Sequence, residues 1–283
     1  MSSNLSGHVT VSEDPAISIF YKASSPVTEK PVIVVSHSLA AATWLWDSFV
    51  DKFEADYSIV SYDIRYHGES SALVVGDDGS LPTHTIEDLA ADVIKLLDHL
   101  DVTQAEAFLG LSIGGGIATV IAAQFADRFR HVIPVGSRSS ASPGDETAWN
   151  ARIALAREKG MPVVAKQSVE RWFPAEWRLA NPALAAEFAE RVGRQSVEGF
   201  IANVQALRVI NLIPHAEQIA RSGNSQRVLF VVGADDMPPV VTETKAMATA
   251  AGSKVEIVEG AGHIVHVAQP QVFFDLVEEF LKT

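Results

Sequence analysis

Apolar residues follow two kinds of pattern along this chain, and the first kind predicts strands. Residues 9–11 and 17–21 alternate apolar and polar positions on either side of Glu13-Asp14-Pro15, a pattern typical of an antiparallel hairpin. Six further segments are short apolar runs, which indicate strands buried on both faces of a parallel sheet. These runs are residues 31–36, 57–64, 105–109, 131–136, 226–233 and 254–258.

The second pattern has the spacing of helices that bury one face. It is clear at Ile86, Leu89 and Val93. Thr85 and Asp88, at the start of this segment, have the spacing of a capping box. Strands and helices alternate along most of the chain, so we predict an α/β fold with a mostly parallel eight-stranded sheet. In such folds, ligands bind at the carboxyl ends of the strands.

One long segment departs from this alternation. Between residues 138 and 216 the strand pattern is missing and helical spacing continues, for example at Leu184, Phe188 and Val192. We therefore predict a core made of residues 1–137 and 217–283, with a helical cap of residues 138–216 inserted into it.

The segment 110–114, Gly-Leu-Ser-Ile-Gly, fits the pattern G-x-S-x-G between a predicted strand and an alanine-rich helix. In the nucleophile elbow of α/β-hydrolases, such a serine sits in a strained turn, and the glycines leave room for the backbone. Ser112 is therefore the predicted nucleophile. The N–H groups of Ile113 and of Leu39, in the loop after the third strand, are the predicted oxyanion-hole donors.

An acid and a histidine follow the serine in the order that this fold requires. His263 comes after the last predicted strand and is the predicted general base. Asp236, after the preceding strand, is the predicted acid, with Asp235 as the alternative. No carboxylate or cysteine near His263 and His266 completes a metal site, so we predict no metal.

Two other histidines lie beside predicted loops of the site. His37 follows the third strand, and His67 follows the fourth. Because His37 lies beside the oxyanion loop, we interpret it as a structural, hydrogen-bonded residue rather than as a catalytic base. His67 lies in a turn, and we interpret it as a histidine that bonds to the backbone rather than as a ligand.

The contexts of these residues resemble the α/β-hydrolase superfamily over nearly the whole chain. Four segments resemble the cap of 3-oxoadipate enol-lactonases: WNARI at 149–153, REKGM at 157–161, ERWF at 170–173 and VEGF at 197–200. The resemblance implies a serine hydrolase that opens a lactone without a cofactor. Those lactonases usually have glycine where this chain has Ala40 and Tyr66.

Two other classes of function remain open. A carboxylesterase or a C–C bond hydrolase would use the same catalytic residues with a different pocket. A ligand receptor on the same fold would need no intact triad, and all three members are present in this sequence.

Composition and net charge limit the classes of partner that this chain can bind. The chain has 283 residues, 47% of them hydrophobic, no cysteine and a net charge of −13. This charge repels nucleic acid and anionic membranes, and neither an apolar leader nor a transmembrane run is apparent. We therefore expect a cytoplasmic enzyme whose partner is a small-molecule lactone or ester. The sequence carries no signal for an oligomeric state.

The predicted cap differs from the rest of the chain in charge. It holds ten Lys and Arg against eight Asp and Glu, although the whole chain is acidic. Arginine can bind a carboxylate through two hydrogen bonds, so an acidic substrate would need such a group at the pocket. The predicted substrate-binding residues are Arg138, Trp149, Arg152, Arg171 and Trp172.

Overall fold

A computed structural model describes residues 5–76, 80–142 and 144–283 of the chain. The first four residues of the amino-terminal segment, which we expected to carry no leader, lie outside the described residues. In the described part, eight strands form one sheet in the order β1-β2-β4-β3-β5-β6-β7-β8. The predicted eight-stranded α/β fold is thereby confirmed.

All neighbouring strands from β4 to β8 pair in parallel, whereas β1 and β2 form the predicted antiparallel hairpin at one edge. The parallel strands β3, β4 and β7 are buried along their whole length, which explains their uninterrupted apolar sequences. The strands are β1 (Ser6–Glu13), β2 (Ala16–Ala23), β3 (Val32–Ser36), β4 (Ser58–Tyr62), β5 (Ala105–Leu111), β6 (Phe129–Val135), β7 (Leu229–Gly233) and β8 (Lys254–Val258).

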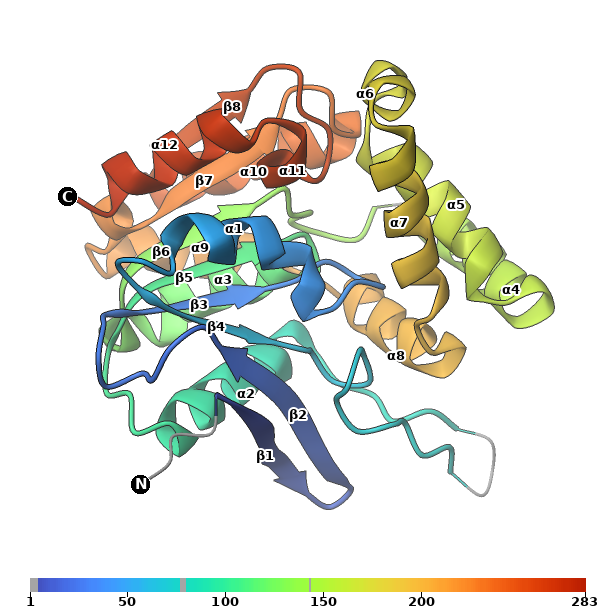
Figure 1. Cartoon of the computed structure of the whole chain (residues 1–283), viewed down its shortest axis with the longest axis horizontal. Helices are drawn as coiled ribbons and strands as arrows, with labels where there is room; N and C mark the ends of the chain where they lie inside the picture. The colour runs from blue at the N-terminus through green and yellow to red at the C-terminus, as the bar shows by residue number, and fades with distance from the viewer. Residues whose placement is uncertain (1–4, 77–79, 143) are drawn as a thin grey trace.

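Helices cover both faces of the sheet (Figure 1). On one face, α2 (Ile86–His99), α3 (Ile113–Gln124), α9 (Ile213–Arg221) and α10 (Pro238–Ala251) pack against one another in that order. On the other face, α1 (Asp47–Phe53) packs against α12 (Pro270–Phe280) through aromatic contacts such as Phe49–Phe274. The predicted capping box of α2 is present, with Thr85 and Asp88 each accepting the other's backbone N–H.

A group of helices lies beside the sheet rather than on its faces, at the right of Figure 1. It consists of α4 (Asp145–Lys159), α5 (Met161–Trp172), α6 (Ala175–Ala180), α7 (Pro182–Gly193) and α8 (Val197–Arg208). The predicted boundary between residues 216 and 217 falls inside α9, which packs on α3 and α10. The division of the chain into a core and a cap stays a prediction.

Two non-glycine residues hold the left-handed backbone conformation at the loops that border the site. Ala40, in the loop after β3, has φ of 63°, and Tyr66, in the loop after β4, has φ of 66°. Both side chains are buried. These are the two positions at which the resembling lactonases usually carry glycine, so the loops adopt a backbone that glycine would favour.

Candidate active site

Ser112 lies in a strained turn between β5 and α3, with φ of 62° and ψ of −113°. A Cβ on Gly110 would lie 1.9 Å from the Gly114 carbonyl oxygen, and a Cβ on Gly114 would lie 2.6 Å from the Ser36 oxygen. Both distances are far shorter than van der Waals contact. The glycines of the G-x-S-x-G segment are therefore a steric requirement of the turn that presents Ser112.

His263 and Asp236 meet at the carboxyl ends of the last two strands. The His263 Nδ1–H group donates to Asp236 Oδ2 at 2.8 Å, and both residues are buried. Asp236 Oδ1 accepts the Met237 N–H at 2.7 Å, which orients the carboxylate. Asp235 is exposed to solvent, so the structure brings Asp236 rather than Asp235 to the histidine.

The two predicted oxyanion donors lie on either side of Ser112 in the fold. Leu39 belongs to the loop after β3, and Ile113 is the first residue of α3. Within the part of the chain that the structure describes, no hydrogen-bond acceptor takes the N–H of either residue. The first N–H groups of a helix lack intrahelical acceptors, so the Ile113 N–H is free to bind an anion.

The predicted nucleophile and general base line a cavity of about 200 Å³ at the carboxyl end of the sheet. Leu39, Ser112 and His263 line it from the sheet side. All five predicted substrate-binding residues also line it: Arg138, Trp149, Arg152, Arg171 and Trp172. A small cavity that combines apolar side chains with a few polar groups suits a small-molecule substrate.

Two of the arginines face this cavity without a carboxylate partner. Arg152 lies over the rings of Trp149 and Phe200, at 5.2 and 5.4 Å, and donates to the Ser168 hydroxyl at 3.2 Å. Burial, together with the charge of Arg171, lowers the pKa of Arg152 to about 9, so it stays protonated at pH 7. Burial also lowers the pKa of Arg171, which makes no hydrogen bond or ion pair with any described residue.

Arg138 differs from these two because its guanidinium is already bound. Its Nε donates to Glu243 at 2.6 Å, and its Nη2 lies 3.0 Å from Asp145. Glu243 also accepts the backbone N–H groups of Ser139 and Ser140. Arg138 therefore ties the loop after β6 to α10 and α4, and its positive charge is compensated within the protein.

The other histidines near the site bond to the backbone, as predicted for His37 and His67. Burial is the main cause that lowers the pKa of His37 to about 4 and that of His67 to about 3. His266, the second member of the rejected metal pair, stacks on Trp46 with ring centroids 4.2 Å apart and donates to the Leu45 carbonyl at 2.8 Å. None of the three rings faces the cavity beside Ser112.

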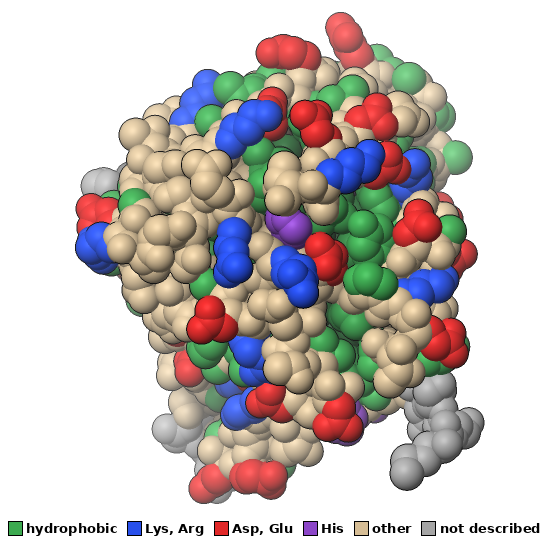
Figure 2. Space-filling view, turned by 90° about the vertical axis from the view of Figure 1, so that its left-hand side faces the viewer, with side chains coloured by type: hydrophobic (Ala, Val, Ile, Leu, Met, Phe, Trp, Pro, Cys, Tyr) green, Lys and Arg blue, Asp and Glu red, His purple; other side chains and the backbone are tan. Residues whose placement is uncertain are grey.

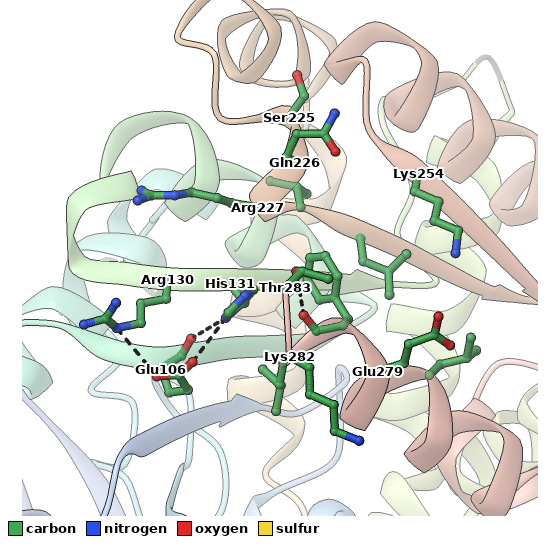
Figure 3. Close-up of a pocket in the computed structure, with 15 residues that line it drawn as sticks. Glu106, Arg130, His131, Ser225, Gln226, Arg227, Lys254, Glu279, Lys282 and Thr283 are labelled. Carbon is green, nitrogen blue, oxygen red and sulfur yellow. Dashed lines mark hydrogen bonds and ion pairs between the residues drawn. The ribbon is translucent and has the colours of Figure 1, made fainter.

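A second cavity, of about 640 Å³, lies at the opposite, amino end of the strands (Figure 3). Basic and acidic side chains are interspersed over this face of the molecule (Figure 2). His131 and Glu106 point toward each other in the cavity, and Phe280 packs on the His131 ring at 5.2 Å. None of the predicted site residues line this larger cavity, so its size does not make it the candidate site.

Sequence analysis missed four apolar residues of the lining. Leu207, Ile210, Met237 and Val240 face the cavity of Ser112. Met237 directly follows Asp236, and Val240 begins the next run of apolar residues, so their place just after the predicted strand 226–233 was the available signal. Leu207 belonged to a helical apolar pattern that also fits a buried core, so the sequence alone did not separate these roles.

Two kinds of feature are absent from the described residues. No group of three or more His, Cys, Asp and Glu side chains is arranged to hold a metal ion in the described parts of the chain. Among the same residues, none of the helices combines the length and apolar composition that crossing a membrane requires.

Comparisons with known proteins agree with the observed fold. A family model described as "alpha/beta hydrolase fold" matches residues 31–270. The chain is 32% identical to 3-oxoadipate enol-lactonase 2 of Acinetobacter baylyi, over 90% of each chain. It is 27% identical to a putative carbamate hydrolase, RutD, of Caulobacter segnis, over 91% of this chain and 93% of that one. The crystal structure of the enol-lactonase from Burkholderia xenovorans matches with a TM-score of 0.82 and 27% identity, covering 98% of this chain and all of that one.

Proposed function

The chain belongs to the α/β hydrolase fold family, and from this we propose that it is a serine hydrolase that opens a lactone ring. The observation that carries the proposal is the single cavity lined by Ser112, His263 and Leu39, with Asp236 hydrogen-bonded behind the histidine. The similarity to an enol-lactonase at 32% identity supports a lactone as the bond that is cleaved.

In the proposed first step, His263 takes the proton of Ser112 Oγ while that oxygen attacks the lactone carbonyl carbon. The Leu39 and Ile113 N–H groups stabilise the oxyanion that forms. The ring C–O bond then breaks, and His263 returns its proton to the leaving oxygen. The product of this step is an acyl-enzyme that still holds the opened chain.

Water completes the reaction in the second step. His263 accepts a proton from the water, whose oxygen attacks the acyl carbon, and Ser112 Oγ leaves and takes the proton back. One water is consumed, and the ring-opened product carries a carboxylate and a hydroxyl group or its keto form. The catalytic groups in both steps are side chains and backbone N–H groups of this chain.

The same pocket favours a substrate that carries a carboxylate. Arg152 and Arg171 place two positive charges in the cavity that Ser112 lines, without a carboxylate partner among the described residues. Moving an uncompensated charge out of water costs free energy, and an anionic ligand would offset that cost. Of the three predicted arginines, we assign the substrate carboxylate to these two, because Arg138 already binds Glu243 and Asp145.

A panel of four substrates tests the proposal. It contains a carboxylated five-membered lactone, the methyl ester of the same compound, a p-nitrophenyl ester and an aryl carbamate. We expect the highest kcat/KM for the carboxylated lactone. The carbamate belongs in the panel because of the RutD relative. A higher kcat/KM for the aryl ester would make the protein a carboxylesterase, and no turnover of any member would leave the receptor alternative.

A further inference from the structure

We propose that His37 and His67 are positioning residues that together fix the two peptide units on either side of Leu39 and so aim its N–H group at the reacting oxygen. This inference rests on the proposed function, because it concerns the oxyanion hole of that same site. It goes beyond it by giving a catalytic consequence to two buried histidines that take no part in proton transfer.

His37 acts on the peptide unit between Ser38 and Leu39. Its Nε2 accepts the Ile64 N–H at 3.0 Å, so the neutral ring carries its proton on Nδ1. That Nδ1–H donates to the Ser38 carbonyl at 2.8 Å. In a trans peptide the C=O and N–H bonds point in opposite directions, so a bond that holds the Ser38 oxygen also fixes the direction of the Leu39 N–H.

His67 acts on the next peptide unit. Its Nε2 accepts the Ala40 N–H at 3.0 Å, and its Nδ1–H donates to the Arg65 carbonyl at 3.3 Å. Ala40 has φ of 63°, a conformation that an alanine adopts only when its surroundings hold it. The bond from Ala40 to His67 supplies part of that hold.

The two rings lie together beneath the loop. Their centroids are 5.6 Å apart, and both side chains are no more than 1% exposed. Both rings carry the same tautomer, with Nδ1 as donor and Nε2 as acceptor. Burial lowers the pKa of both rings and keeps them neutral, and the neighbouring His37 adds to this effect at His67. A second proton on either Nε2 would lie against a backbone N–H.

Asn203 of α8 shares a hydrogen-bond acceptor with His67. Its Nδ2 donates to the Arg65 carbonyl at 2.9 Å, so that oxygen accepts from both Asn203 and the His67 ring. The His84 Nε2–H donates to Asn203 Oδ1 at 3.1 Å, which fixes the orientation of the amide. Gly199, one turn earlier on α8, allows close approach, because a Cβ there would lie 2.1 Å from the Tyr66 oxygen.

Asparagine and glutamine variants test the roles of the two histidine ring nitrogens one at a time. An asparagine amide reaches roughly the place of histidine Nδ1, and a glutamine amide reaches the place of Nε2. At position 37 the bond to the oxyanion loop uses Nδ1, so His37→Asn preserves it and His37→Gln loses it. At position 67 the bond to the oxyanion loop is the one from the Ala40 N–H to Nε2, so His67→Gln preserves it and His67→Asn loses it.

We expect opposite rankings at the two positions. His37→Gln should have a kcat roughly 10- to 100-fold below that of His37→Asn, and His67→Asn should fall below His67→Gln by a similar factor, since losing one oxyanion donor costs about 10²- to 10³-fold. KM should change less than about threefold. Rates are measured with a p-nitrophenyl ester and divided by the sites that a p-nitrophenyl phosphonate titrates, so misfolded protein does not count.

His131 provides the matched control. It is a buried histidine that lines the distant cavity of Figure 3, and its Nδ1 bonds to the Glu106 carbonyl. His131→Asn and His131→Gln should not alter kcat per titrated site. Equal kcat values for the Asn and Gln variants at both 37 and 67, or losses confined to the number of titrated sites, would overturn the positioning role.

A measurement on the parent protein avoids any problem of folding. Long-range ¹⁵N correlation spectra at pH 7 should show His37 and His67 as neutral rings protonated on Nδ1. An Nε2–H tautomer at either ring would contradict the inference. A parent protein that neither reacts with the phosphonate nor hydrolyses esters would overturn the proposed function itself, whereas an active parent with the wrong tautomers overturns only the positioning role.

Discussion

Asp236 and His263 form a buried hydrogen bond of 2.8 Å, although 27 positions separate them along the chain. Each residue follows a different strand, and β7 and β8 pair directly in the sheet. The bond leaves Nε2 of His263 as the ring nitrogen available to a proton from Ser112. This relationship makes the acid assignment testable at a single position.

Replacing Asp236 by asparagine should lower kcat by roughly 10³- to 10⁴-fold, because the amide disturbs the tautomer of His263 and removes its charge partner. Asp235→Asn is the matched control, since Asp235 is exposed and one residue away. Its kcat should stay within about twofold of the parent. Steady-state hydrolysis of a p-nitrophenyl ester measures both, and the reverse ranking would move the acid to Asp235.

Ser112→Ala should remove turnover by several orders of magnitude while the melting temperature stays close to that of the parent. The hydroxyl performs the chemistry. Because the triad members act as a unit, removing one of them should cost nearly as much activity as removing all three. His263→Ala should match it in kcat. Near-parental hydrolysis of every ester and lactone by Ser112→Ala would contradict the nucleophile assignment.

Arg152→Met and Arg171→Met test the anion site. At least one should raise KM for the carboxylated lactone by roughly 10- to 100-fold, equivalent to about 1.5–3 kcal/mol for a charge-assisted hydrogen bond. The methyl ester of the same lactone should be affected less than about threefold. Arg194→Met is the control, because Arg194 is 73% exposed and pairs with Glu190 on the helix surface. Equal effects on charged and neutral lactones would favour a neutral substrate.

Stability should fall as the pH falls from about 6.5 toward 5, because buried histidines stay neutral in the folded protein. Burial lowers the pKa of His37 and His266 to about 4 and that of His67 to about 3, so only the unfolded chain takes up these protons between pH 6.5 and 4. Each such histidine contributes a slope of up to about 1.4 kcal/mol per pH unit.

Urea unfolding of the parent and of His67→Gln at pH 7.5, 6 and 5 measures the contribution of His67 to the pH dependence of stability. The difference in free energy of unfolding between the two proteins should change by about 1 kcal/mol per pH unit near pH 5, with the parent showing the steeper loss. Parallel curves for the parent and His67→Gln would mean that His67 is protonated in the folded state as readily as in the unfolded chain.

The predictable part of the fold is the part with local signals. A strand buried on both faces must be apolar at every position, so residues 31–36 and 226–233 identified β3 and β7 to within a few residues. The turn at Ser112 needs glycine two positions before and after it, and this steric requirement is written in the sequence. The order of the strands in the sheet leaves no such local trace.

Pairings between distant segments were outside what the sequence pattern could predict. Arg138 was predicted to bind substrate from its place after β6, but its charge is compensated by Glu243, 105 positions away. The contact of Asn203 with the Arg65 carbonyl joins residues 138 positions apart, and nothing in helical periodicity distinguishes Asn203 from a polar residue on a solvated face. Such bonds depend on the folded geometry of both partners.

Ala40 and Tyr66 also have a consequence for the unfolded ensemble. A left-handed backbone costs a non-glycine residue roughly 1–2 kcal/mol in the folded state, whereas glycine adopts it freely. Glycine, however, gives the unfolded chain more conformations to lose, which costs about 0.4–1 kcal/mol on folding. The side chains at both turns therefore add local strain to the folded state. They also restrict the conformations of the unfolded chain, and the buried Tyr66 ring adds packing in the folded state.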